Sequence, residues 1–436
     1  MNESSSEIRN PIARFLLRST NIKDNEIKAA VASFVFIFIL MAGYFLLRPM
    51  RDSMASDWTD AEVSWLWTLN FFISTVIVAI YGLFVSKLDF KKLVPGIYLF
   101  FAASFIIFYL IAGSSSDTVF VNKSFYVWIS VYALFNVSVF WSFMADTFNK
   151  DQAARLFSVF AAGASLGATA GGFMSAVLSQ TIGERPMVLI TAVMLFCIIP
   201  IILFLHKQKE SDLGNADLVV DAAKTKIGGN PIGGFKTFFT NPYILGIGCF
   251  IILYTGLGSF VYFFQKNLLA DFASADRTAI YGIRDGLTNM ITFVLAFVVT
   301  GRIVPKLGMP VALALVPFLM IIGMGILALS PVWLIAVAVW VASRAGNYGL
   351  TRPAREMLFT QVSREDRFKA KPVIDIVAYR GGDVMMAWLF TFLTSGIGLG
   401  LAMVAAVGAG IMAVWTALAM FLGRNYERSE SSNNVD

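Results

Sequence analysis

The chain has 436 residues, of which 57% are hydrophobic and only 14% charged, with a mean hydropathy of +0.72 and a net charge of +6. Soluble globular domains carry about 25% charged residues, so this composition, with apolar runs of about 20 residues along the whole chain, excludes a soluble protein and indicates an all-α polytopic membrane protein. The basic residues lie in short loops rather than in a solvated stripe, which argues against nucleic-acid binding. One histidine and two cysteines leave little material for a metal site or a nucleophile, so we expect no cofactor and no enzymatic activity.

Twelve apolar segments of membrane-spanning length follow one another along the chain. The first half contains 28–50, 63–86, 93–113, 124–146, 154–179 and 187–206. The second half contains 242–265, 278–304, 308–329, 331–351, 372–395 and 399–422. Residues 207–241 form the longest non-apolar stretch and are rich in glycine and in charges of both signs, as expected of a linker. We therefore predict two six-helix bundles, 1–206 and 242–436, joined by this linker.

The Lys and Arg residues of the loops are unevenly distributed. When the N-terminus is placed inside, most of them fall in segments that face the cytoplasm, as the positive-inside rule requires. The first 26 residues lack the apolar core and cleavage site of a signal peptide. We predict a multi-pass, monomeric protein of the bacterial inner (cytoplasmic) membrane with both termini cytoplasmic.

Two loops at equivalent places in the two halves share a pattern. Gly82 and Lys87 follow the second apolar segment, and Gly301 and Lys306 follow the eighth, about half the chain later. Repeated halves that flank a site near the membrane midplane are typical of secondary transporters. Both loops also resemble the motif Gly-xxx-Asp-Arg-x-Gly-Arg-Arg of the major facilitator superfamily. The resemblance implies that superfamily's fold, with 12 transmembrane helices in two pseudo-symmetric six-helix bundles.

Six ionisable residues lie inside apolar segments of the second half. A charge at membrane depth costs roughly 2.5–3.5 kcal/mol on insertion scales unless it faces a partner or water, so these residues are candidates for a functional site. They are Arg284, Asp285, Arg344, Asp375, Arg380 and Asp383. The alternative is a set of ion pairs that fasten helices together.

Spacing groups these charges. Arg344 and Asn347 are three residues apart, so they share a helix face near the midplane, and the same spacing holds for Arg380 and Asp383. Asp375 lies about one turn from the cytoplasmic face, which favours a gate or a structural lock. Arginines that converge at the midplane favour an anionic or zwitterionic solute.

The first apolar segment ends in a polar group. Arg48, Arg51 and Asp52 surround Pro49, which bends or ends the helix. Hydropathy is compatible with arginines that line a central cavity and with arginines that snorkel to the outer surface.

A stripe of small residues follows in the segment 154–179. Gly163, Gly167 and Gly171 are spaced four apart, a pattern that lets two membrane helices approach closely. We expect this stripe to pack against a helix of the other half.

Three stretches carry longer motifs. They are Tyr44–Asp52, the pair Phe140–Phe143 and Ala154–Gly167, and the pair Asn347–Met357 and Lys369–Asp375. They resemble the Tyr-xx-Leu-Arg-xx-Lys-Asp, Phe-Trp-x-Phe, Gly-Ala-Asn and Lys-Tyr-Ser-Leu-Phe-Asp-Pro-Thr-Lys-Glu-Met motifs of the ATP:ADP antiporter family. That family comprises nucleotide transporters of plastids and intracellular bacteria, a divergent branch of the facilitator fold.

The chain departs from that family at three positions. Asn347 and Arg51 stand where the family has lysine, and Ile129 stands where it has an acidic residue. Arginine binds phosphate as a planar fork and lysine as a point charge, so the two are not equivalent. Asn347 is the position at which we expect the substrate to have changed.

These observations predict a secondary transporter that moves a small anionic or zwitterionic solute across the lipid bilayer by alternating access, in its most concrete form by nucleotide exchange of the ATP/ADP type. The alternative is a proton-coupled facilitator for another organic anion, a siderophore or a drug. The candidate substrate-binding residues are Arg48, Arg51, Asn136, Arg284, Arg344, Asn347 and Arg380. The candidate coupling or gating residues are Asp52, Asp285, Asp375 and Asp383.

Overall fold

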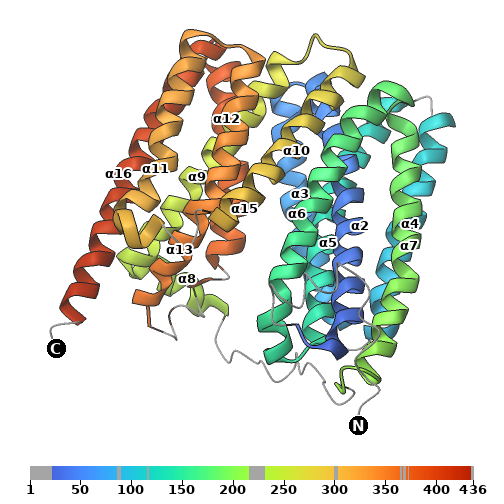
Figure 1. Cartoon of the computed structure of the whole chain (residues 1–436). Helices are drawn as coiled ribbons and strands as arrows, with labels where there is room; N and C mark the ends of the chain where they lie inside the picture. Colours follow the sequence, from blue (N-terminus) through green and yellow to red (C-terminus); the bar gives the residue numbers. More distant parts are fainter. Residues whose placement is uncertain are drawn as a thin grey trace. The chain divides into compact units, whose positions relative to one another are not determined.

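The computed structural model describes residues 22–85, 90–114, 117–215, 231–298, 303–363, 366, 370–371 and 373–433, and these residues form helices and connections without a strand (Figure 1). The long helices of the first half are α2 (Ile27–Met54), α3 (Asp60–Val85), α4 (Phe90–Ser114), α5 (Thr118–Thr147), α6 (Lys150–Thr181) and α7 (Glu184–Glu210). The helices of the second half are α8 (Pro231–Thr240), α9 (Pro242–Leu268), α10 (Ser274–Val298), α11 (Ile303–Leu329), α12 (Trp333–Gly346), α13 (Arg352–Leu358), α15 (Tyr379–Thr391) and α16 (Leu401–Asn433).

Local sequence signals set several of the helix starts. Asn149 caps α6 by accepting from the backbone N–H of Gln152, whose side chain accepts from the N–H of Asn149 in return. Asn241 caps α9 by accepting from the backbone N–H groups of Tyr243 and Ile244, directly before Pro242 at the first helical position. Gly183 ends the α6–α7 connection with φ = 81°, a conformation that favours glycine.

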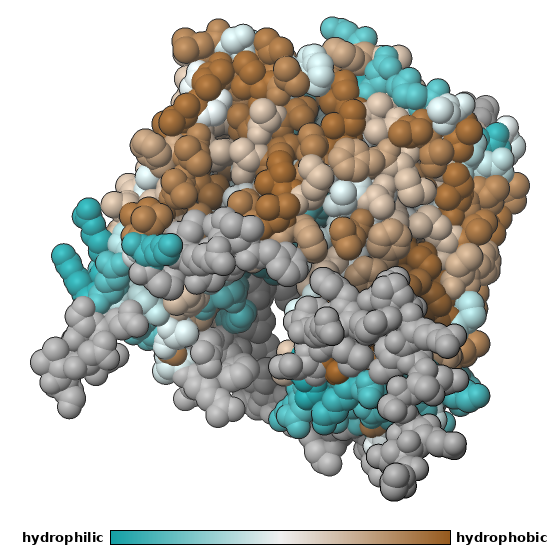
Figure 2. All heavy atoms as spheres, in the orientation of Figure 1, coloured by the Kyte–Doolittle hydropathy of each residue, from teal (hydrophilic) through white to brown (hydrophobic). Residues whose placement is uncertain are grey.

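Eight helical segments of the described residues are long and apolar enough to cross a membrane. Large apolar side chains such as Phe72 (62% exposed) and Leu329 (90% exposed) lie on the surface. Apolar residues also cover most of the helix surface visible in Figure 2. Such a surface is stable in contact with lipid rather than with water.

Two of the predicted membrane spans are interrupted. The span predicted over 331–351 consists of α12 followed by the π-helical turn η3 (Asn347–Thr351). The span predicted over 372–395 contains α15 between the π-helical turns η5 (Ile374–Ala378) and η6 (Phe392–Gly396). π-helical turns insert an extra residue into a helix and occur frequently at functional sites.

The chain forms two compact units. Unit 1 comprises Met1–Arg48 and Ile77–Thr225, and unit 2 comprises Pro49–Val76 and Lys226–Asp436. Helices α2 and α3 therefore each contribute to both units. Of the linker predicted over 207–241, residues 216–230 lie outside the described residues, and the predicted division into 1–206 and 242–436 stays a prediction.

In unit 1, the glycine stripe of α6 packs directly on the backbone of α2. A Cβ atom added to Gly167 would lie 2.3 Å from the carbonyl oxygen of Phe38, and one added to Gly171 would lie 2.3 Å from that of Ala42. The predicted close approach is present, but the expectation of a partner from the other half is wrong. The pattern of small residues fixes how near a neighbour can come and contains no information on which helix it is.

In unit 2, α9 is the central helix and packs against α12, α15 and α16, while α11 and α16 run side by side (Figure 1). Most residues of α9 are buried, including Phe250, Phe260 and Phe264. The polar groups described below therefore project from, or pack against, a helix that is surrounded by protein.

Candidate functional site

Unit 2 contains nine of the eleven candidate residues, and Arg48 and Asn136 belong to unit 1. Eight of the nine fall into two groups or lie beside them, whereas the side chain of Asp375 lies outside the described residues. The Arg284 cluster comprises Arg51, Asp52, Gln265, Arg284 and Asp285. The Arg344 cluster comprises Tyr254, Arg344, Tyr379, Arg380 and Asp383.

The Arg284 guanidinium is fully buried and fully engaged. Its Nη2 donates to Oδ2 of Asp52 at 2.7 Å, its Nε donates to Oδ1 of Asp285 at 2.9 Å, and its Nη1 donates to Oε1 of Gln265 at 2.8 Å. Arg51 donates from Nη2 to the other oxygen of Asp52 at 2.6 Å. Two arginines thus face two aspartates, and the formal charges of the cluster cancel.

Aromatic rings cover the faces of the Arg284 and Arg344 guanidinium groups. The Cζ atom of Arg284 lies 4.5 Å from the ring centroids of Tyr281 and Trp340. The Cζ atom of Arg344 lies 4.6 Å from the same Trp340 ring. One indole therefore stabilises two cations by cation–π interaction, and it links the two clusters physically.

Arg344 has different polar surroundings. Its Nη1 donates to the hydroxyl of Tyr254 at 2.9 Å, and its buried Nε has no hydrogen-bond acceptor in the described part of the chain. Among the described residues no carboxylate forms an ion pair with it, and the side chain is partly exposed. Arg344 is thus a charge inside an apolar segment with donor capacity left for a ligand.

Arg380 and Asp383 complete the second cluster. Both are half-buried on α15, and Asp383 interacts electrostatically with Arg344 and Arg380 without forming an ion pair to either within the described residues. The backbone carbonyl of Asp383 accepts from Oγ of Ser259 at 3.4 Å, which joins α15 to α9. Two arginines and one aspartate leave this cluster with a formal charge of +1.

Asn347 lies at the first position of the π-helical turn that follows α12. Its side chain is buried, with 4% exposure, one turn beyond Arg344. Within this turn, Gly349 lets Leu295 of α10 pack closely, because a Cβ atom added to Gly349 would lie 2.7 Å from Cβ of Leu295. The structure therefore places Asn347 where the helix axis is distorted.

The two candidates of unit 1 are not members of either cluster. Arg48 is half-buried, and its Cζ lies 5.4 Å from the ring centroid of Phe45. Asn136 is fully buried and donates to the carbonyl of Leu40 at 3.4 Å, while its side-chain oxygen accepts no hydrogen bond from the described residues.

The charged stretch after α12 forms an ion-pair network outside the predicted membrane spans. Lys371 Nζ donates to Oε2 of Glu356 at 2.7 Å, and Arg355 Nη2 donates to its Oε1 at 2.6 Å. Burial opposes ionisation of Glu356, but the hydrogen bonds from Lys371 and Arg355 outweigh it and hold the pKa of Glu356 below its ordinary value.

An apolar cavity of about 710 Å³ lies between α10, α11 and α12. Its walls are leucine, isoleucine, valine, alanine and methionine side chains with Gly346, and none of the candidate residues lines it. A cavity without polar groups offers nothing to orient a polar solute, so the charged clusters remain the candidate site.

Four residues of the two clusters were not among the predicted site residues: Gln265, Tyr254, Tyr379 and Trp340. The predicted span ended at Gln265, whereas α9 continues to Leu268, and the Gln265 side chain is completely buried. The three aromatic residues were assigned no role. One signal was available, because Trp340 precedes Arg344 by four residues and so shares its helix face.

Comparisons with known proteins agree on the fold. The model of the Major Facilitator Superfamily matches residues 33–370. A bacterial homologue of the human lysosomal transporter Spinster, in an inward-facing and unoccupied conformation, is 14% identical, with a TM-score of 0.58 over 93% of this chain and 97% of that chain. The nucleoside transporter NupG is 13% identical, with a TM-score of 0.64 over 92% of this chain and 99% of that chain.

A search of curated proteins gave no match. The family match covers more than half of the chain, and the solved structures share its all-helical architecture over almost their whole length. The chain therefore belongs to the Major Facilitator Superfamily, as a multi-pass membrane transporter of a small solute.

Proposed function

We propose that this transporter carries a small anionic solute and binds it at the Arg344 cluster. The observation that supports this most is the contrast between two arginines. Arg284 is fully buried and matched by two carboxylates, whereas Arg344 is partly exposed and has no ion-pair partner in the described residues. An unmatched arginine in an apolar surrounding is favourable only when water or an anion reaches it.

Within this proposal Arg284 stabilises the fold through its ion pairs with Asp52 and Asp285, and Arg344 and Arg380 bind the solute. The net charge of +1 in the Arg344 cluster favours a phosphate or carboxylate group. The hydroxyl of Tyr254 and the neighbouring ring of Tyr379, 6.2 Å away between centroids, add a polar donor and an aromatic surface.

Nucleotide exchange is the most specific form of the proposal. Its support is the resemblance of three stretches to the ATP:ADP antiporter family, together with a fold shared with a nucleoside transporter. Asn347 in place of that family's lysine removes one cation, so we expect a solute with fewer negative charges than ATP, such as a nucleoside monophosphate or diphosphate. The proposed setting is a bacterial inner membrane, with a monomeric protein and both termini in the cytoplasm.

The test is uptake by the purified protein in proteoliposomes. Labelled ATP, ADP, AMP, orthophosphate and small dicarboxylates are offered with and without the same solute inside. Arg344→Ala is expected to raise KM roughly 10- to 100-fold, the value of one or two lost hydrogen bonds to a charged group. Arg424→Ala, at an exposed position of α16, is the matched control and keeps wild-type KM. An unchanged KM in Arg344→Ala contradicts the site, and absence of nucleotide flux contradicts the nucleotide form.

The second candidate function is proton-coupled transport of another organic anion. The supporting observation is Asp383, a carboxylate close to Arg344 and Arg380 without an ion pair to either. In this case an imposed pH gradient drives accumulation, and Asp383→Asn abolishes that accumulation while exchange of internal for external solute continues. Accumulation that is indifferent to the pH gradient rules this candidate out.

A further inference from the structure

A long apolar space lies open between α10, α11 and α12 of unit 2. Helix α12 and the turn η3 pack against both α10 and α11, and no comparable contact joins α10 to α11 in the described residues (Figure 1). Two helices that rest on a third without meeting leave a channel between them, and the third helix is its floor. We call this channel the α12 groove; its lining comes from Leu287–Leu295 of α10, Leu315–Met320 of α11, and Leu334–Leu350 of α12 and η3.

Small side chains on α12 make the groove deep. Ala338, Ala342 and Gly346 are spaced four apart, so they share one helix face, and all three line the groove. Ala338 and Ala342 are exposed, which leaves the floor accessible from outside. The walls carry larger side chains, of which Ile291 of α10 is 37% exposed and Leu319 of α11 is 47% exposed. The groove is therefore open along one side rather than enclosed.

The open side of the α12 groove continues into the lipid-facing surface. Val294, one turn from the groove lining on α10, and Phe318 and Ile322, one turn from it on α11, are exposed apolar side chains. Residues Lys306–Leu329 of α11 are one of the segments that are long and apolar enough to cross a membrane. The groove therefore opens into the hydrocarbon of the bilayer and not into water.

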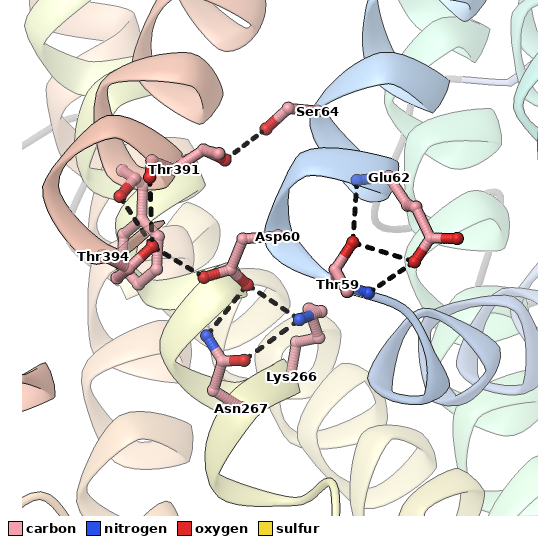
Figure 3. Close-up of polar contacts among 9 residues, drawn as sticks. Thr59, Asp60, Glu62, Ser64, Lys266, Asn267, Thr391 and Thr394 are labelled. Carbon is pink, nitrogen blue, oxygen red and sulfur yellow. Dashed lines mark hydrogen bonds and ion pairs between the residues drawn. The ribbon is translucent and has the colours of Figure 1, made fainter. Parts of the chain in front are cut away.

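Other helix contacts of unit 2 are closed by the side chains of the protein itself. Nζ of Lys266 donates to Oδ1 of Asp60 at 2.8 Å, and Oγ1 of Thr394 donates to Oδ2 of Asp60 at 2.9 Å (Figure 3). The rings of Phe260 and Phe390 meet edge to face, with centroids 5.4 Å apart. The α12 groove, in contrast, is an open space of about 710 Å³, so its occupant comes from outside the chain.

The chemistry of the lining selects hydrocarbon as the occupant. An unfilled cavity costs free energy in proportion to its volume, because the atoms of its walls lose their dispersion contacts. Water held in a cavity needs several polar partners, and the leucine, isoleucine, valine, alanine and methionine side chains of the lining supply none. A saturated chain needs no hydrogen-bond partner and restores the lost contacts.

The dimensions of the groove fit a hydrocarbon chain and not a helix of a second protein. Leu334 and Leu350, the first and last lining residues of α12 and η3, are about 24 Å apart along the helix at about 1.5 Å per residue. The volume then corresponds to a mean cross-section of about 30 Å², whereas a helix with its side chains, about 10–12 Å in diameter, needs at least about 80 Å². The groove is also shorter than the hydrocarbon core of a bilayer, which is about 30 Å thick.

We propose that acyl chains of membrane phospholipids occupy the α12 groove in single file and are held there more tightly than the lipids around the rest of the protein. A chain in the groove contacts protein on three sides, and a lipid on a convex helix surface contacts it on one, so dispersion attraction favours the groove. Ala342 and Gly346 each lie two residues from Arg344 and so on the nearly opposite side of α12. The bound chain therefore supports, from behind, the helix that carries Arg344.

Photolabelling in a bilayer tests the proposal. The protein is placed in vesicles of phosphatidylethanolamine and phosphatidylglycerol that contain a trace of phosphatidylethanolamine with a diazirine in one acyl chain. After illumination, mass spectrometry of peptides is expected to show several-fold more label on 287–295 and 338–346 than on the lipid-facing surface of α16. Ala342→Phe fills the groove and should lower that label roughly tenfold, the equivalent of about ten lost atom–atom contacts. Ala413→Phe, at an exposed position of α16, is the matched control and leaves it unchanged. Groove label no higher than that of α16, or unaffected by Ala342→Phe, overturns the proposal.

A second arm measures binding through stability; like the first, it needs no solute and is independent of the proposed anion. Phosphatidylethanolamine added to the protein in detergent is expected to raise the unfolding temperature of the wild type and of Ala413→Phe, because a ligand that binds the folded state stabilises it. Ala342→Phe should show less than half of that rise. Should Ala342→Phe not elute as a monodisperse protein, Ala338→Leu is used in both arms. Equal rises in the wild type and the groove variant overturn the proposal. A wild-type dimer that becomes monomeric in the groove variant would assign the groove to a second copy and overturn it as well.

Discussion

Arg284 and Arg344 contact the same indole and yet differ in what surrounds their charges. Arg284 is buried with Asp52, Asp285 and Gln265, so each of its donor positions is used inside the protein. Arg344 donates to the hydroxyl of Tyr254 and packs over the Trp340 ring. At the residue scale, therefore, a charge inside an apolar segment is a structural or a binding group according to how many of its donors the protein itself satisfies.

Replacement of these arginines separates the two roles. Arg284→Ala removes a buried guanidinium that pairs with two buried carboxylates, Asp52 and Asp285, and is expected to destabilise the protein by about 3–5 kcal/mol. Arg344→Ala removes no ion pair and is expected to lower thermal stability much less. The measurement is the unfolding temperature in detergent. The double variant Arg284→Ala/Asp285→Ala should recover part of the loss, and equal unfolding temperatures for the two single variants would contradict the assignment.

Glu356 predicts a pH dependence outside the membrane. Its pKa is held below the ordinary value of 4.5 by Lys371 and Arg355, so its contribution to stability is present above that value and is lost as the pH falls through the folded-state pKa. Between about pH 5 and about pH 3 the wild-type unfolding temperature should fall more steeply than that of Glu356→Gln. Parallel curves for the two proteins would show that the network contributes nothing.

At the element scale, the sequence patterns predicted how closely two helices approach better than which helices or residues are in contact. Glycines four apart predicted a close helix contact, and the structure shows it, but against α2 rather than a helix of the other half. In the same way, the spacing of Arg284 and Asp285 gave no indication that Asp52, 232 residues earlier, completes the site. Helix-forming runs and buried charges are local properties of a sequence, whereas the partner of a charge depends on tertiary register.

The α2–α6 contact makes a prediction about packing. Gly167→Ala places a methyl group where the α2 carbonyl oxygen of Phe38 lies 2.3 Å away, so the helices must separate, at a cost of about 1–3 kcal/mol. Gly410→Ala on α16 is the matched control, since its added Cβ meets nothing within 4 Å. Unfolding temperatures should fall for Gly167→Ala and stay equal or rise slightly for Gly410→Ala. A fall of the same size in both would contradict the contact.

For the whole molecule, the apolar runs predicted a polytopic helical membrane protein, and the resemblance of two loops implied the superfamily fold that the comparisons confirm. They could not show that α2 and α3 divide between two units. A hydropathy pattern treats each helix as one object, whereas the contacts of α2 change unit at Pro49 and those of α3 after Val76. The substrate stays a prediction, because it depends on a few side chains around Arg344 rather than on the pattern of spans.

This division predicts the behaviour of the two halves. Residues 231–436 expressed alone lack the Asp52 and Asp60 carboxylates, which leaves Arg284 and Lys266 without their ion-pair partners from the first half. We expect the isolated half to aggregate on extraction into detergent and to be recovered as a soluble complex when co-expressed with residues 1–215. Size-exclusion chromatography measures the recovered fraction. An isolated half that elutes as a monodisperse species would contradict the expectation.

The ion pairs Asp52–Arg284 and Asp60–Lys266 also have a consequence for how the chain is synthesised and folded. Asp52 is synthesised 232 residues before Arg284, and Asp60 is synthesised 206 residues before Lys266. At elongation rates of about 5–20 residues per second, these carboxylates wait roughly 10 to 50 seconds for their partners. During that interval the nascent first half presents acidic groups at the edge of the membrane, where protons, water or the insertion machinery must shield them. The folding of this transporter is therefore completed late, by contacts that its earliest helices cannot make alone.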